Sequence, residues 1–160
     1  MMYSKSFGIL LILSLIVSGC GSNESPGENK KQTLHPSLTS NSIEVSQSWA
    51  RPASAGTNSA AYLHIFNGTD RPDTLLSVKA DAAENAAVHE SYREDGISSM
   101  LPARRLIIQP DSSLSLAPGV YHIMLMNLKK SMAESDSLNL QLSFSETGNR
   151  TITIPVKLTY

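Results

Sequence analysis

The sequence contains a single cysteine among its 160 residues, and this scarcity excludes several kinds of site. One cysteine forms no intramolecular disulfide, no CxxC redox centre and no cysteine-rich zinc site. Charged residues make up 17% of the chain, which is low for a soluble domain, and the formal net charge is -1. Because nucleic-acid binding needs a basic surface that contacts many phosphates, no nucleic-acid partner is expected.

The sequence also lacks a hydrophobic run long enough to span a bilayer, which takes about 20 apolar residues. The apolar run at 8–17 follows Lys5 and is closed by small residues. A basic start, a short apolar stretch and small residues are typical of a bacterial secretory signal. Residues 17–20 (VSGC) resemble the lipobox of bacterial lipoproteins, which implies cleavage before Cys20 and lipid attachment to its thiol. The alternatives are an ordinary signal peptide with an incidental cysteine, or a short membrane anchor.

These features divide the chain into three parts. Residues 1–19 are the predicted lipoprotein signal peptide, and 20–42 comprise the lipidated Cys20 and a flexible tether. The tether is rich in Ser, Asn, Gly, Pro and Lys, so it buries too little apolar surface to offset its ordering entropy. Residues 43–160 form the folded domain. The predicted location is extracytoplasmic, with a lipid anchor in a bacterial membrane, on the periplasmic side or at the cell surface.

Apolar and polar residues alternate over most of 43–160, which predicts β-strands. Short strands separated by turns predict an all-β fold, either a β-sandwich or a Greek-key barrel. Pro155 interrupts the last strand, which indicates an edge position or a bulge. Only 81–87 has helical composition, enough for one or two turns. The predicted strands are 43–49, 60–66, 74–78, 87–92, 105–108, 113–116, 121–128, 138–144 and 151–158.

Histidine and methionine are spaced so that several side chains could share one metal ion. In the predicted strand 121–128, His122, Met124 and Met126 lie on one face, with neighbours about 7 Å apart. His89 lies near the end of another predicted strand, and Met100 follows a turn signal at 95–96. Imidazole and neutral thioether ligands favour Cu(I) over hard ions. Zinc would be expected to use thiolates or more histidines, and a blue-copper site needs a cysteine ligand that the domain lacks.

Simpler interpretations exist for these residues. Each methionine, taken alone, fits better as a filler of irregular gaps in the core than as a metal ligand. His64 matches no motif and is expected to be a structural or surface residue, and Glu90 should point away from the face of His89. The chain has no GxSxG or HExxH motif and no persuasive acid/base set, so it is not expected to be an enzyme.

The spacing of the candidate ligands is more specific than their types. His89, Met100, His122 and Met124 are separated by gaps that fit the pattern H-x10-M-x21-H-x-M. On this pattern the domain resembles the PCuAC family of extracytoplasmic copper chaperones over roughly 43–156. Other segments that resemble the family are 49–52 (WARP), 60–62 (AAY), Asn67, 95–96 (DG), 116–126 (LAPGVYHIMLM) and 142–144 (LSF).

The resemblance implies a cupredoxin-like Greek-key β-sandwich that binds one Cu(I) ion at an exposed end. Its ligands would be His89, Met100, His122 and Met124, with Met126 behind them or in the core. The implied function is a copper chaperone that delivers copper by ligand exchange to a copper-accepting protein, such as cytochrome c oxidase subunit II or another copper chaperone. The alternative is a lipoprotein β-sandwich that binds another protein and has no metal role.

Overall fold

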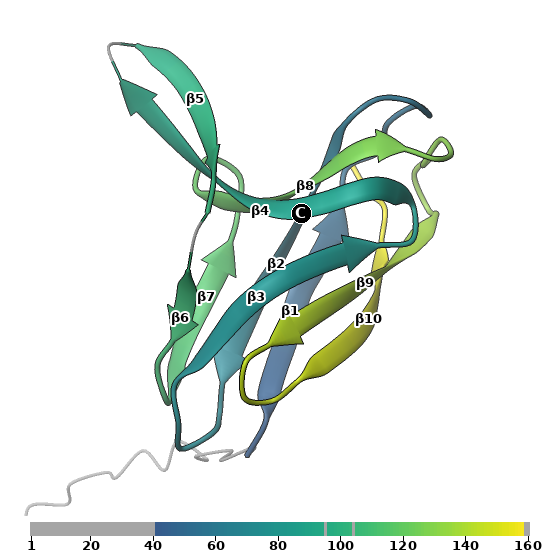
Figure 1. Cartoon of the computed structure of the whole chain (residues 1–160). Helices are drawn as coiled ribbons and strands as arrows, with labels where there is room; N and C mark the ends of the chain where they lie inside the picture. Colours follow the sequence, from purple (N-terminus) through teal and green to yellow (C-terminus); the bar gives the residue numbers. More distant parts are fainter. Residues whose placement is uncertain (1–40, 95, 104, 159–160) are drawn as a thin grey trace, which may run out of the picture. The chain divides into compact units, whose positions relative to one another are not determined.

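Two packed β-sheets make up the computed structural model of the protein, which describes residues 41–94, 96–103 and 105–158 (Figure 1). One sheet has six strands in the order β1-β2-β7-β8-β4-β5, and the other has four in the order β10-β9-β3-β6. The predicted all-β sandwich is therefore confirmed. The strands are β1 (Ile43–Ala50), β2 (Ser59–Asn67), β3 (Asp73–Ala80), β4 (Ala83–Glu94), β5 (Ile97–Pro102), β6 (Leu106–Ile108), β7 (Ser112–Leu116), β8 (Tyr121–Leu128), β9 (Ser137–Phe144) and β10 (Asn149–Pro155).

The predicted signal peptide at 1–19, Cys20 and nearly all of the tether at 20–42 lie outside the described residues. Within the described ranges, no helix is long and apolar enough to cross a membrane. The folded part begins with β1 at Ile43, where the sequence predicted the first strand.

The core lies between the two sheets and is built from every second residue of the strands. In β2, Ala61, Leu63 and Ile65 are buried, and β9 contributes Leu140 and Leu142 to the same cluster. Each fully buried leucine or isoleucine contributes roughly 1.5–3 kcal/mol relative to an exposed one. Because side chains alternate along a strand, the residues between these core positions face outward. This outward face of the six-stranded sheet carries the candidate site.

The short helix predicted at 81–87 is wrong, because β4 starts at Ala83 within that segment. Ala82 and Ala83 are each 2% exposed, and Ala83 pairs with Leu128 of β8. The helical propensity of alanine and glutamate is a weak preference, which pairing with β8 and burial against the core override. The same strand runs on to Glu94, so it is longer than the predicted strand at 87–92.

Two further strand boundaries differ from the prediction. The sequence did not predict β5, because Ile97–Pro102 has two adjacent serines and no clear alternation. The last strand ends at Pro155 and does not extend to residue 158. β10 is the outermost strand of its sheet, as the proline predicted, since proline has no N–H to donate to a further strand.

A buried carboxylate ties β3 to the turn between β9 and β10. Asp73 is 1% exposed, and its oxygens accept hydrogen bonds from the backbone N–H groups of Glu146 and Thr147 and from the hydroxyls of Ser145 and Thr147. Burial alone would raise the pKa of Asp73, but these donors outweigh it and lower the pKa to about 2. The carboxylate is therefore charged in the folded protein down to strongly acidic pH.

Candidate metal site

The four predicted ligands come from three adjacent strands, and the strand register places them on one face. β4 and β8 are antiparallel, with His89 directly opposite His122. β4 also pairs with β5, so that Ser91 lies opposite Met100. His89 and Ser91 are two residues apart on β4 and share a face, as do His122 and Met124 on β8. The register therefore brings both histidines and both methionines to the outer face of the six-stranded sheet.

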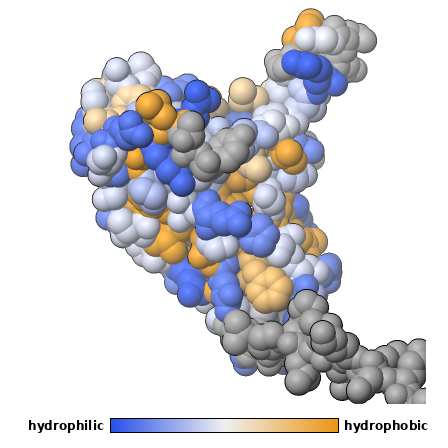
Figure 2. All heavy atoms as spheres, turned by 180° about the vertical axis from the view of Figure 1, so that it is seen from behind, coloured by the Kyte–Doolittle hydropathy of each residue, from blue (hydrophilic) through white to orange (hydrophobic). Residues whose placement is uncertain are grey.

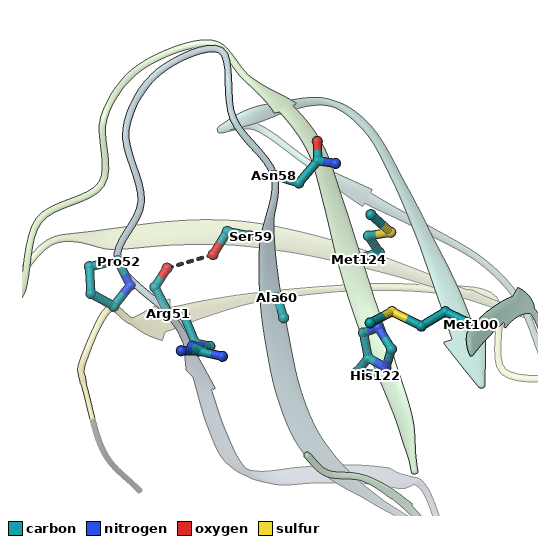
Figure 3. A pocket seen from close by; sticks show the side chains of 8 residues that line it. All are labelled: Arg51, Pro52, Asn58, Ser59, Ala60, Met100, His122 and Met124. Atoms are coloured by element: carbon teal, nitrogen blue, oxygen red, sulfur yellow. Dashed lines mark hydrogen bonds between the residues drawn. The ribbon is translucent and has the colours of Figure 1, made fainter. Parts of the chain in front are cut away.

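Three of these side chains line a surface hollow of about 290 Å³ (Figure 3). Figure 3 shows the Met100 side chain extending toward the ring of His122, with Met124 beside them. Met100 is 56% exposed, whereas His122 is only 6% exposed. The hollow thus has a deep imidazole and an outer thioether. Its remaining lining residues are Arg51, Pro52, Asn58, Ser59 and Ala60.

The two histidine rings lie side by side, with their centroids 6.1 Å apart. Nδ1 of His89 is buried and has no hydrogen-bond partner, which is a costly state for a polar atom. Burial, and then the proximity of His122, hold the pKa of His89 below its ordinary value. Nδ1 of His122 lies 3.4 Å from Oγ of Ser91. A largely neutral imidazole with an unpartnered nitrogen beside a second imidazole fits a site for a soft metal ion.

Small side chains flank Met124 on both sides. Ala60 of β2 and Ala87 of β4 each lie directly opposite Met124 on the neighbouring strand. Cross-strand neighbours in such positions have Cβ atoms about 4.5–5.5 Å apart, so a larger side chain at either position would crowd the thioether. The alanines leave the flexible Met124 side chain free to turn toward His122.

Other residues considered from the sequence lie apart from this group. Met126 is half-buried on the same face of β8, opposite Asn85, and is not among the residues that line the hollow. His64 lines a separate hollow, together with Trp49 and Tyr62.

Glu90 lies on the face of β4 away from His89, as the sequence predicted. It lies opposite Tyr121 on β8, and both residues alternate with His89 and His122, so their side chains lie on the other face of the sheet. Burial, followed by the charge and a hydrogen bond of Glu90, raises the pKa of Tyr121. This carboxylate is therefore engaged by a phenol on the face away from the candidate ligands.

The sequence singled out 49–52 and 60–62 for their family resemblance, but it did not predict that residues of these segments line the hollow. The segment from Arg51 to Ala60 closes back on itself, because Oγ of Ser59 donates to the carbonyl of Arg51 (Figure 3). This segment lies beside β8 because β2 pairs with β8, a strand that is distant in sequence, and such pairing cannot be predicted from a local sequence pattern. Within the described ranges, no three His, Cys, Asp or Glu side chains gather, so a metal site here depends on the thioethers.

Comparison with known proteins agrees with this fold. The family model "Putative lipoprotein LpqE-like" matches residues 43–156. The protein named "Putative lipoprotein Lxx21020" from Leifsonia xyli is 29% identical over 123 residues, which cover 76% of this chain and 74% of that protein.

Two solved structures are similar over nearly three quarters of the chain. The apo PCuAC domain from PmoF1 has a TM-score of 0.62 and 26% identity, covering 73% of this chain and 94% of that domain. The copper-bound PCuAC domain from PmoF2 has a TM-score of 0.57 and 29% identity, covering 73% and 93% respectively. The chain therefore belongs to the LpqE-like lipoprotein family, and its β-sandwich is a PCuAC-type domain.

Proposed function

We propose that this protein is a copper chaperone that binds one Cu(I) ion through His89, Met100, His122 and Met124. The observation that carries the proposal is the register of β4, β5 and β8, which gathers two imidazoles and two thioethers on one face. The copper in the related PmoF2 domain supports the choice of metal. The protein catalyses no covalent reaction in this role, and its cargo leaves as it entered, by exchange of ligands.

The donor set favours the reduced ion. Thioether sulfur is soft and neutral, and two histidines and two methionines add no negative charge to balance a second positive charge on copper. Arg51 lines the same hollow and adds a cation nearby. Because its repulsion is greater for Cu(II) than for Cu(I), we expect the site to hold copper in the +1 state.

The burial of the ligands suggests the order in which they are exchanged. Met100 is the most exposed and lies on the edge strand β5, so a soft ligand of an acceptor replaces it first. His122 is the most deeply buried and releases the ion last. The acceptor is a copper-accepting protein such as cytochrome c oxidase subunit II or another copper chaperone. A lipid on Cys20 and the tether at 20–42 would hold the domain at the extracytoplasmic surface of a bacterial membrane, where mass spectrometry of the mature N-terminal peptide would detect the lipid.

Competition with a Cu(I) chelator tests the assignment. The wild-type protein is expected to take up one Cu(I) per chain, and the double variant Met100→Leu/Met124→Leu is expected to lose most of that affinity. Leucine preserves the apolar volume and removes only the sulfur. Met126→Leu is the matched control, because Met126 lies on the same face of β8 outside the hollow. Unchanged affinity in the double variant, or an equal loss in the control, would reject the proposed ligand set.

A further inference from the structure

The edge strand β5 lacks the features that usually protect the edge of a sheet. Edge strands are commonly protected by charged residues, proline, bulges or shortness, because their unpaired backbone groups can bind another strand. β1 carries Glu44 and a bulge, β10 carries Arg150 and Pro155, and β6 has three residues. β5 has neither a charged residue nor a bulge, and its proline is at its last position. Among the described edge strands, β5 is thus the least protected.

The backbone groups of Met100 face this open side. The N–H of Ser91 donates to the carbonyl of Val120, so the backbone groups of Ser91 point toward β8 and away from β5. Ser91 lies opposite Met100, so these two residues form a non-hydrogen-bonded pair of the antiparallel ladder. In such a pair the backbone N–H and C=O groups of the two residues point away from each other. The N–H and C=O of Met100 and of Ser98, two residues earlier, are therefore directed to the free edge.

Two of the most exposed apolar side chains in the described chain lie on this strand. Ile97 is 68% exposed and Leu101 is 57% exposed. They share the face opposite Met100 and are placed symmetrically about Ser99. Figure 2 shows the β4–β5 hairpin as an arm that stands clear of the body and carries hydrophobic surface near its end.

We propose that β5 pairs with β5 of a second copy of this chain, in an antiparallel arrangement with a two-fold axis at Ser99. This register places each Ile97 opposite the Leu101 of the copy, so both exposed side chains become covered. It also places Met100 opposite the copy's Ser98, as a hydrogen-bonded pair formed by the outward-facing backbone groups. The apolar residues are self-complementary in this register, which is why the occupant is a second copy and not an unrelated strand.

The contact is expected to be transient. Pairing over five residues of each strand buries less accessible surface area than the roughly 1,200–2,000 Å² that a stable interface buries. Pro102 has no N–H and limits the ladder to Ile97–Leu101. The protein would therefore be mostly monomeric when dilute and would pair at high local concentration.

If the proposed Cu(I) site is correct, this pairing brings two sites together. Met100 and the copy's Met100 become diagonal neighbours on the same face, a relationship in which Cβ atoms are about 7–8 Å apart or less. Methionine side chains can cover that distance, so an ion held by one chain could pass to the other through the two outermost ligands. The pairing itself needs no metal, so it can be tested separately from copper binding.

A cysteine at the two-fold axis tests the arrangement. In full-length Cys20→Ser protein, which has no other cysteine, Ser99→Cys is expected to form a disulfide-linked dimer under mild oxidation without metal. Ser99 and the copy's Ser99 would be a non-hydrogen-bonded pair with Cα atoms about 4.5 Å apart, within the range that a disulfide spans. Ser46→Cys is the matched control, because Ser46 is exposed on β1, the opposite edge of the same sheet.

Cross-linking of Ser99→Cys at least tenfold faster than Ser46→Cys supports the proposal, and equal rates overturn it. Adding Leu101→Lys should slow cross-linking of Ser99→Cys at least tenfold, since it places two lysines in the pair of strands. Leu101 faces away from the candidate ligands, so Leu101→Lys alone should still bind one Cu(I) per chain. Failure of Ser99→Cys to cross-link faster than Ser46→Cys, in a protein that still binds Cu(I), would reject only the pairing. Absence of Cu(I) binding in the wild-type protein would reject only the metal assignment.

Discussion

His89 and His122 lie directly opposite each other on β4 and β8, with ring centroids 6.1 Å apart, although they are separated by more than thirty residues in sequence. The pair depends on backbone hydrogen bonds between two central strands of the sheet and not on a flexible loop. The imidazoles are thereby held close together by the fold itself, which would reduce the ordering cost of binding an ion between them.

Replacing either histidine should weaken Cu(I) binding strongly. We expect His89→Leu and His122→Leu each to lower Cu(I) affinity at least tenfold, measured by chelator competition. Because both rings would hold the same ion, the double variant should lose less than the sum of the two single losses in free energy. Strictly additive losses would contradict a shared ion. His64→Leu, outside the candidate site, is the control and should leave the affinity unchanged.

Enlarging a small neighbour of Met124 should block the site without removing a ligand. Ala60→Leu places a branched side chain opposite Met124 and inside the hollow. We expect a loss of Cu(I) affinity of at least fivefold, with urea unfolding changed little because Ala60 faces away from the core. Ala117→Leu is the control, since Ala117 lines the separate hollow near His64. An unaffected affinity in Ala60→Leu would show that the ion does not occupy this hollow.

The buried carboxylate of Asp73 should make the fold sensitive to acid. Its pKa falls from 3.8 to about 2 on folding, so it contributes about 2 kcal/mol to the free energy of unfolding at neutral pH. A lowered pKa gives stability that is complete above pH 4 or so and is lost as the pH falls toward 2. Asp73→Asn should therefore reduce stability by about 2 kcal/mol in urea unfolding at pH 7, and by much less near pH 2.

The control for this prediction is Asp70→Asn, because Asp70 is exposed. It should change the unfolding free energy by less than about 0.5 kcal/mol, as is usual for surface substitutions. A difference between wild type and Asp73→Asn that stays constant from pH 7 to pH 2 would contradict the role assigned to the charge.

Methionine oxidation should inactivate the site from its exposed end. Met100 is 56% exposed and Met132 is 4% exposed, so peroxide should convert Met100 to its sulfoxide first. Because the sulfoxide no longer offers a soft thioether, Cu(I) affinity should fall in step with oxidation of Met100, followed by peptide mass spectrometry. Equal oxidation of Met100 and Met132, or a Cu(I) affinity that stays unchanged while Met100 is oxidised, would speak against the assignment.

Much of the fold could be predicted from alternation alone, as in 138–144, where every second residue is apolar and buried. Prediction failed where burial depends on distant partners. At 81–87, alanines that favour a helix are packed against the core because the segment pairs with β8. At 97–102, two adjacent serines interrupt the alternation that would have predicted the edge strand β5. The candidate ligands were identifiable from their spacing. Arg51 and Ala60 lie in segments with family resemblance, but their place beside the ligands was not predicted, because β2 and β8 are distant in sequence.

Within 122–125, alternate residues of strand β8 face the candidate site and the core. Ile123 and Leu125 are fully buried, whereas His122 and Met124 face the candidate site. Substitutions of Met124 are therefore expected to change metal affinity with less effect on folding than substitutions of Ile123 or Leu125. An insertion or deletion of one residue within the strand would exchange the two sets at once. Point substitutions can therefore change the residues that face the candidate site, whereas a change in the length of β8 would also disrupt the core.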